Sequence, residues 1–161
     1  YPPHLFTETY RKAREWGMRV VAHAGEAVGP ESIWGAVKEL QAERIGHGIR
    51  CVDDQDLMVL LKDQQIPIEV SPTSNYHLGV VDADRPHPIR QMVDGGLNCC
   101  ITTEDSSMFS TNLSQEYELL MEQCFGFEEV GQLNRNAIQS SFLSAGEKQQ
   151  LSDQLDTYLA S

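Results

Sequence analysis

The chain has 161 residues, of which 40% are hydrophobic and 22% charged, and its formal net charge is −12. This length suffices for one modest domain with its own core. The acidic excess, with no basic stripe to offset it, argues against a nucleic-acid partner and against an anionic membrane surface. No apolar run has the length of a membrane span, and no signal-peptide pattern is present.

The four cysteines form no Cys-X-X-Cys pair. Cys99 and Cys100 lie together in an apolar segment, whereas Cys51 and Cys124 lie in separate segments. This spacing indicates neither a zinc knuckle nor a disulfide framework. We therefore expect a reducing, cytoplasmic setting.

Short apolar segments alternate with helical patterns along the chain. The first helix is expected over 5–16 and is ended by Gly17. Asp53 is the predicted N-cap of a later helix, and residues 71–88, rich in Pro, Asp, Asn and His, are predicted to form a loop. Strands are predicted at 20–22, 44–46, 66–70 and 98–102, and helices at 5–16, 30–40, 53–64, 88–93, 114–124, 127–140 and 144–159.

This alternation predicts parallel strands joined by right-handed crossovers. No glycine-rich phosphate loop or dinucleotide fingerprint follows any strand, which counts against a Rossmann domain. A (β/α)8 barrel usually takes about 250 residues, and only four strands are predicted here. The sequence therefore predicts an α/β fold that is half of a TIM barrel: four parallel strands with flanking helices and extra C-terminal helices, in a single partial domain over residues 1–161.

Polar residues stand at the carboxyl end of each predicted strand. Because parallel strands end at the same edge of a sheet, these residues are expected to form one active-site face. Gly25 lets the backbone approach whatever is bound there. Two His, one Glu and two adjacent carboxylates are the side chains needed for metal-assisted hydrolysis. The four strand ends are His23-Ala24-Gly25-Glu26, His47 between two glycines, Ser71-Pro72-Thr73-Ser74-Asn75, and Glu104-Asp105.

Simpler interpretations exist for these residues. A lone His in a strand is more often a hydrogen-bonded core residue than a ligand, and adjacent acids are often a solvated loop or a helix cap. The repeated position at strand ends favours a site for His23 and His47. By contrast, His87, flanked by prolines, is expected in a loop, and His4 and His77 are expected to be structural or solvated.

Four runs in this order resemble the C-terminal half of the adenosine deaminase family. They are His23-Ala24-Gly25-Glu26, Arg44-Ile45-Gly46-His47-Gly48, Ser71-Pro72-Thr73-Ser74-Asn75 and Thr102-Thr103-Glu104-Asp105. Segments 29–34 and 112–117 are similar to bacterial members, so the similarity extends over essentially the whole chain.

The resemblance implies zinc-dependent hydrolytic deamination of adenosine, or of a related 6-aminopurine, to inosine and ammonia. His23 and Glu104 would be ligands of one Zn²⁺ ion. Glu26 would protonate the purine ring nitrogen, and His47 would orient the attacking water and help to deprotonate it. On the substrate side, Asp105 would bind the imidazole edge of the purine.

Two departures from the family pattern set expectations for this chain. The family also uses a His-X-His pair from the first barrel strand, and no such pair occurs in these 161 residues. Full activity is therefore expected to need an N-terminal half that is not present here. The family also has Asp-Asp-Pro where this chain has Glu104-Asp105-Ser106, and the added methylene moves the ligand carboxylate by roughly 1 Å, a displacement that can slow catalysis.

The expected partner is a small purine nucleoside, together with a second copy of the chain or the missing N-terminal half. An alternative hypothesis is a non-catalytic, deaminase-derived half barrel that functions by association with another chain. Unpaired strand edges and large apolar patches would favour such association.

Overall fold

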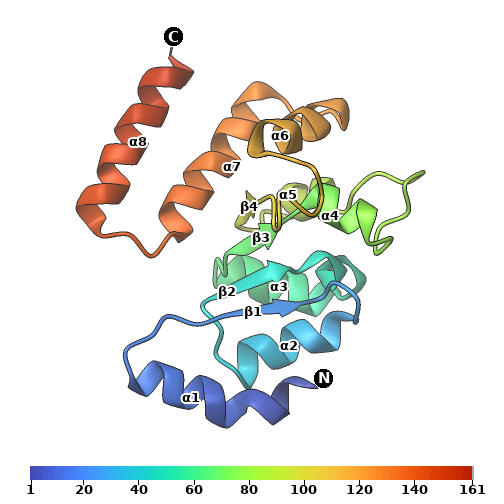
Figure 1. Cartoon of the computed structure of the whole chain (residues 1–161), viewed down its shortest axis with the longest axis vertical. Helices are drawn as coiled ribbons and strands as arrows, with labels where there is room; N and C mark the ends of the chain where they lie inside the picture. The colour runs from blue at the N-terminus through green and yellow to red at the C-terminus, as the bar shows by residue number, and fades with distance from the viewer. Residues whose placement is uncertain (161) are drawn as a thin grey trace.

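Four short parallel strands form one sheet in the computed structural model, which describes residues 1–160. The strands are β1 (Val21–Ala24), β2 (Arg44–His47), β3 (Ile68–Val70) and β4 (Cys99–Ile101). They pair side by side in chain order, and every pairing is parallel. The predicted α/β half barrel is confirmed in this arrangement, which is drawn in Figure 1.

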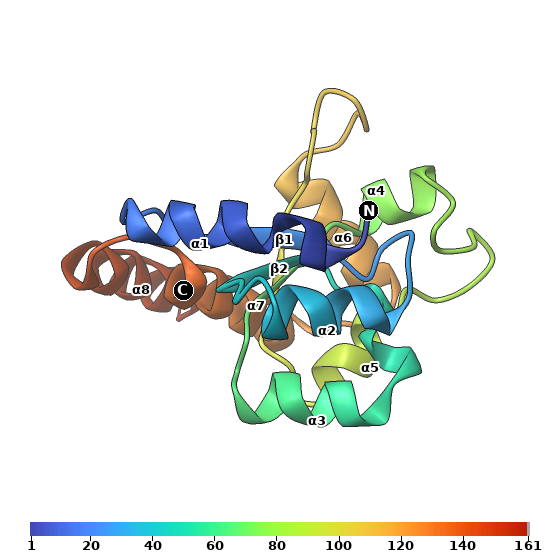
Figure 2. The same cartoon turned by 90° about the horizontal axis from the view of Figure 1, so that it is seen from below.

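Helices separate the strands and extend the chain beyond the last one. Figure 2 shows α2, α3 and α5 together on one side of β1 and β2, while α7 packs against β4 and α8 packs against α7. The helices are α1 (Thr7–Glu15), α2 (Pro30–Lys38), α3 (Gln55–Asp63), α4 (Pro72–His77), α5 (Ile89–Asp94), α6 (Leu113–Glu122), α7 (Phe127–Ser140) and α8 (Ala145–Leu159), with 3-10 turns η1 (Pro3–Phe6) and η2 (Ile49–Asp53).

The helix-covered face of the sheet carries the hydrophobic core. Strand side chains on this face are apolar and almost fully removed from water, and they pack with the inward side chains of the helices. Burial of this apolar surface is the main favourable contribution to folding. The strand residues concerned are Ala22, Ala24, Ile45, Ile68, Val70, Cys99 and Ile101.

The opposite face, here called the interior face, comprises Val21, His23, Arg44, Gly46, Glu69 and Cys100. Side chains alternate between the two faces along a strand, and the register aligns Val21 with Arg44 and His23 with Gly46. Arg44 and Glu69 form an ion pair across it, with Nη1 and Oε1 3.1 Å apart. Val21 remains 38% exposed. Parallel sheets are usually covered on both faces. Cys100 of β4 is only 4% exposed, so the open part of this face lies on the β1 side.

Two local predictions are wrong. Residues 72–77, predicted as part of a long loop, form α4, because Pro72 occupies the first helical turn, where its missing N–H is tolerated. The N-cap of α3 is Asp54 rather than Asp53: its side chain accepts a 3.0 Å hydrogen bond from the Leu57 N–H, and Asp53 belongs to η2.

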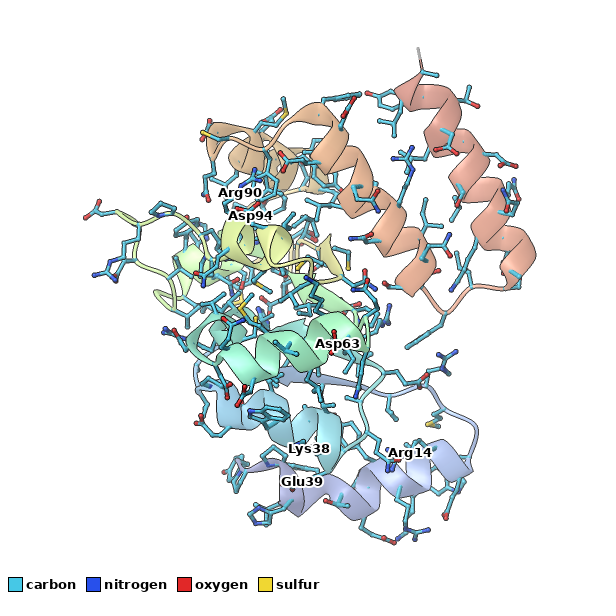
Figure 3. The ribbon with its side chains drawn as sticks, turned by 180° about the vertical axis from the view of Figure 1, so that it is seen from behind. Arg14, Lys38, Glu39, Asp63, Arg90 and Asp94 are labelled. Atoms are coloured by element: carbon cyan, nitrogen blue, oxygen red, sulfur yellow. The ribbon has the colours of Figure 1, made fainter. Side chains whose placement is uncertain are left out.

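Side-chain contacts fix α5 against the start of α7. Arg90 and Asp94 lie side by side on α5 in Figure 3, with Arg90 Nη1 3.3 Å from the Asp94 carboxylate. The same guanidinium pairs with Glu129 at 2.6 Å and lies over the Phe125 ring.

Within residues 1–160, no helix is long and apolar enough to cross a membrane.

Candidate active site

His23, His47 and Glu104 come together at the carboxyl edge of the sheet. One potential ligand atom from each lies within 4.8 Å of the others. The two imidazole centroids are 4.9 Å apart, and His47 Nε2 lies 3.9 Å from Glu104 Oε1. His23 and Glu104 are exposed, whereas His47 is buried. Imidazole nitrogens and a carboxylate oxygen are a donor set that suits zinc, so the residues fit a metal ion.

The backbone around this cluster is left-handed at two of its three members. His47 has a φ of 64° and Glu104 a φ of 52°, values that side-chain-bearing residues adopt infrequently. Strained backbone of this kind concentrates at functional sites, where the surrounding structure holds it in place. Here the Gly48 N–H donates to the Ala24 carbonyl at 2.9 Å and fixes the turn after His47 against β1.

Two glycines lie beside the cluster, and a side chain at either would press on a neighbouring side chain. A Cβ on Gly46 would meet His23 Nδ1 at 3.1 Å, so the absence of a side chain lets the His23 ring lie over β2. Gly25 has a φ of 67°, and a Cβ there would meet the Ile33 side chain at 2.3 Å. The Gly25 N–H donates to Ser32 Oγ, and its carbonyl accepts from the Arg50 N–H. These contacts place the start of the loop after β1 close to α2.

Glu26 lies beside the cluster with one carboxylate oxygen unpartnered. Its Oε1 is 3.6 Å from His47 Nδ1, and it is buried without a hydrogen-bond partner in the described part of the chain. An unsatisfied buried carboxylate oxygen is energetically costly. A bound molecule that donates a hydrogen bond, or shares a proton, would satisfy it.

Asp105 lies apart from the cluster. Its side chain is exposed, and Oδ1 accepts a 2.8 Å hydrogen bond from the Met108 N–H within its own loop. The structure therefore brings together four of the six predicted site residues, namely His23, Glu26, His47 and Glu104, while Gly25 adjoins them through the backbone.

Ser74 and Asn75, from the polar run expected at this edge of the sheet, contact the cluster directly, and His87 reaches it through Asn75. All three are buried. Ser74 Oγ donates to Glu104 Oε2, and Asn75 lies between His47 and His87, 3.1 Å from each ring. For Ser74 and Asn75, the sequence feature that indicated a place near the site was the polar run after β3. His87 does lie in a loop, as predicted, and nothing in its local sequence indicates its burial.

Glu116 joins the first turn of α4 to the loop after β4. It is fully buried on α6, and its carboxylate accepts from the Thr73 N–H at 3.0 Å and from Thr111 Oγ1 at 2.9 Å. Thr73 lies in the first turn of α4 beside Ser74, and Thr111 closes the loop that contains Glu104. The helical pattern around Glu116 gives no hint of this contact.

Burial shifts the titration of the two inner histidines. It lowers the pKa of His47 below the usual value, although the nearby Glu26 and Glu104 carboxylates oppose the shift. Burial also lowers the pKa of His87, to about 4. A neutral imidazole can accept a hydrogen bond, which an imidazolium cannot.

Fold and site together define a parallel α/β half barrel with a potential metal centre at the carboxyl ends of its strands. The family model described as adenosine deaminase matches residues 1–158. The chain therefore belongs to the adenosine deaminase family.

Known proteins with similar sequences or structures support this membership. An adenosine deaminase of Shewanella loihica is 37% identical over 152 residues, which are 94% of this chain and 46% of that protein. The structure of an adenine deaminase from Arthrobacter aurescens superposes with a TM-score of 0.96 at 37% identity, covering 99% of this chain and 49% of that one.

A third similar protein, an amidohydrolase from Burkholderia ambifaria solved with bound zinc, superposes with a TM-score of 0.88 at 30% identity. The match covers 99% of this chain and 47% of that one. The chain thus spans about half the length of the relatives that it matches.

Proposed function

We propose that this chain is the C-terminal half of a (β/α)8 barrel that hydrolytically deaminates a 6-aminopurine, with adenosine as the leading candidate and inosine and ammonia as the products. The observation that carries the proposal is the group formed by His23, His47 and Glu104, with the unpartnered Glu26 carboxylate beside it. Two relatives are named adenosine deaminase and adenine deaminase, which supports a 6-aminopurine substrate.

Zn²⁺ is the proposed cofactor. His23 and Glu104 would hold it, and the further ligands would come from residues outside this chain, since catalytic zinc takes about three protein ligands. When bound, zinc lowers the pKa of water toward about 7 and so supplies a nucleophile at neutral pH. The zinc-containing relative from Burkholderia ambifaria supports this choice of metal.

The residues of this chain then have separate roles. Glu26 holds a proton and delivers it to the purine ring nitrogen adjacent to the carbon under attack. Its half-buried position next to His47 suits a proton-transfer group. His47 orients the attacking water. Asp105 contacts the imidazole edge of the purine from the loop after β4, where its Oδ1 already accepts a hydrogen bond from the Met108 N–H. Gly25 lets the purine approach the backbone after β1.

A second candidate function, a non-catalytic half barrel that associates with another chain, is favoured by the open interior face. On the edge strand β1, Val21 is 38% exposed, and Met18, three residues before it in the chain, is 57% exposed. Apolar surface of this kind at an unpaired strand edge is an association site. The two candidates differ in whether the protein turns over a purine.

The test uses the full-length protein that contains this chain. Zinc-loaded protein is expected to convert adenosine to inosine, to lose the activity on chelation, and to regain it with Zn²⁺. We expect Glu26→Gln to reduce kcat by about 10²- to 10⁴-fold, because general acid catalysis contributes on that scale. Metal analysis of the same samples should show unchanged zinc content, since Glu26 is not a proposed ligand.

Glu31→Gln is the matched control, because Glu31 is exposed on the first turn of α2. A Glu26→Gln variant within a few-fold of the parent would remove the acid role from Glu26. Failure of the zinc-loaded parent to deaminate adenosine, adenine or another 6-aminopurine would overturn the proposed function in favour of the association role.

A further inference from the structure

A line of three buried side chains runs from the cluster into the protein. His47, Asn75 and His87 are respectively 2%, 0% and 1% exposed. Asn75 Nδ2 lies 3.1 Å from His47 Nδ1, and Asn75 Oδ1 lies 3.1 Å from His87 Nε2. The line ends on the backbone, where the Ile89 N–H donates to His87 Nδ1 at 3.1 Å. Every side-chain nitrogen and oxygen of this series except His47 Nε2 therefore has a hydrogen-bond partner.

The backbone end sets the direction of every bond in the line. A backbone N–H can only donate, so His87 Nδ1 must accept and a neutral His87 carries its proton on Nε2. That proton points at Asn75, which must present its oxygen there and its NH₂ group to His47. His47 Nδ1 therefore accepts, and the proton of neutral His47 lies on Nε2.

His87 is firmly held in this orientation. Its backbone N–H donates to Gln123 Oε1 at 3.0 Å, and the edge of its ring meets the Tyr76 ring at a centroid distance of 5.7 Å. Gln123 in turn donates to the Tyr76 hydroxyl at 2.9 Å. The low pKa of His87 agrees with a ring that stays neutral near pH 7.

We propose that His87 is a positioning residue: through Asn75 it fixes the tautomer of His47, so that His47 presents an N–H at Nε2 toward Glu104. The role for catalysis rests on the proposed deaminase function. An Nε2 that carries a proton has no lone pair for a metal, so His47 serves as a hydrogen-bond donor in the cluster and the ligands from this chain are His23 and Glu104. Because His47 Nε2 already carries a proton, the group on this side of the cluster that can accept one is the Glu104 carboxylate, 3.9 Å from Nε2.

Asn75→Asp tests the relay with almost no change of shape. A carboxylate accepts from both histidines, so His47 is expected to move its proton to Nδ1 and leave Nε2 unprotonated. Long-range ¹H–¹⁵N NMR of histidine-labelled full-length protein distinguishes the two tautomers directly. We expect the tautomer to switch and kcat to fall about 10- to 100-fold, as for other residues that orient a site, with KM and zinc content changed less than about threefold.

A second pair of variants keeps the test decisive if Asn75→Asp does not fold. His87→Gln retains an N–H donor toward Asn75 and is expected to keep most of kcat, whereas His87→Phe removes the donor and is expected to lose about tenfold or more. His4→Phe is the matched control, because His4 is exposed in η1.

An unchanged His47 tautomer in Asn75→Asp, or equal kcat values for His87→Gln and His87→Phe, would overturn the proposal. The NMR readout needs no turnover. A parent protein that deaminates no purine would therefore overturn the proposed function, while the tautomer measurement still decides the relay.

Discussion

The two faces of the sheet are built from the same four strands and have opposite properties. On the helix-covered face, Ile45, Ile68 and Val70 are fully buried among apolar side chains. On the interior face, the neighbouring strand positions carry an exposed imidazole at His23 and the Arg44–Glu69 ion pair. Because side chains alternate along a strand, one short segment supplies an apolar contact to the core and a polar group to the interior.

The helix-covered face contributes the apolar packing, whereas the interior face carries polar groups. The core of the helix-covered face fixes the strand positions and their register, and the strands then place His23 and His47 at adjacent ends of β1 and β2. The interior face contributes few apolar contacts of its own. Groups there can therefore be chosen for binding and proton transfer, provided that a scaffold behind them stays rigid.

The comparison can be tested with one substitution made on each face. Val70→Ala, at a fully buried site, is expected to lower the free energy of unfolding by about 2–3 kcal/mol. The substitution removes two methyl groups from the apolar core and leaves a cavity in their place. If further strands close the barrel in the full-length protein, Val21→Ala should cost nearly as much. Urea unfolding of both variants gives the two values. A cost below about 1 kcal/mol for Val21→Ala alone would show that the interior face stays open.

A second prediction concerns the buried His87, in contrast to the exposed His23. Its pKa is about 4 in the folded chain and about 6.5 when unfolded, so below pH 6.5 the unfolded state binds more protons. Stability from this group is present above pH 6.5, falls as the pH drops toward 4, and changes no further below that. We expect a loss on the order of 2 kcal/mol between pH 7 and pH 5.

Urea unfolding at the two pH values, for the parent and for His87→Gln, isolates this contribution. The variant should lose less stability on acidification, because Gln does not titrate. Equal losses in both proteins would assign the acid sensitivity to other groups.

The smallest expected effect is at Glu104, the cluster residue with a left-handed backbone on the open side. Asp is found more readily than Glu in this conformation, and it restores the shorter carboxylate of the family pattern. Glu104→Asp is therefore expected to raise kcat/KM several-fold in zinc-loaded full-length protein. Steady-state kinetics at matched zinc occupancy provide the measurement, and a lower value would mean that the Ser74 contact is adapted to the longer side chain.

Sequence patterns predicted the parts of the molecule that depend on local order. The apolar strand segments and the polar residues at their ends gave the parallel sheet, and His23 and Glu104 were correctly expected at one edge. The helix over 127–140 was predicted to the residue. Such features follow from periodicity and capping, which neighbouring residues determine.

The supporting network could not be predicted, because its contacts join distant segments. Asn75 connects residues 47 and 87, and Glu116 connects positions 73 and 111. Each of these polar residues is common on surfaces and becomes a buried partner only after the helices have packed. Helix α4 was missed for a related reason, since Pro, Ser and Asn also favour loops.

The Glu116 contact has a consequence for motion. Its single carboxylate binds both the start of α4 and the end of the loop that carries Glu104, so these two segments can shift only as one piece unless a buried bond breaks. A substrate that enters between them would have to break that bond. The loop after β1, in which Ala27 and Val28 are exposed to solvent, forms no such hydrogen bond with α6. This loop is therefore the segment of the site that can move at lower energetic cost.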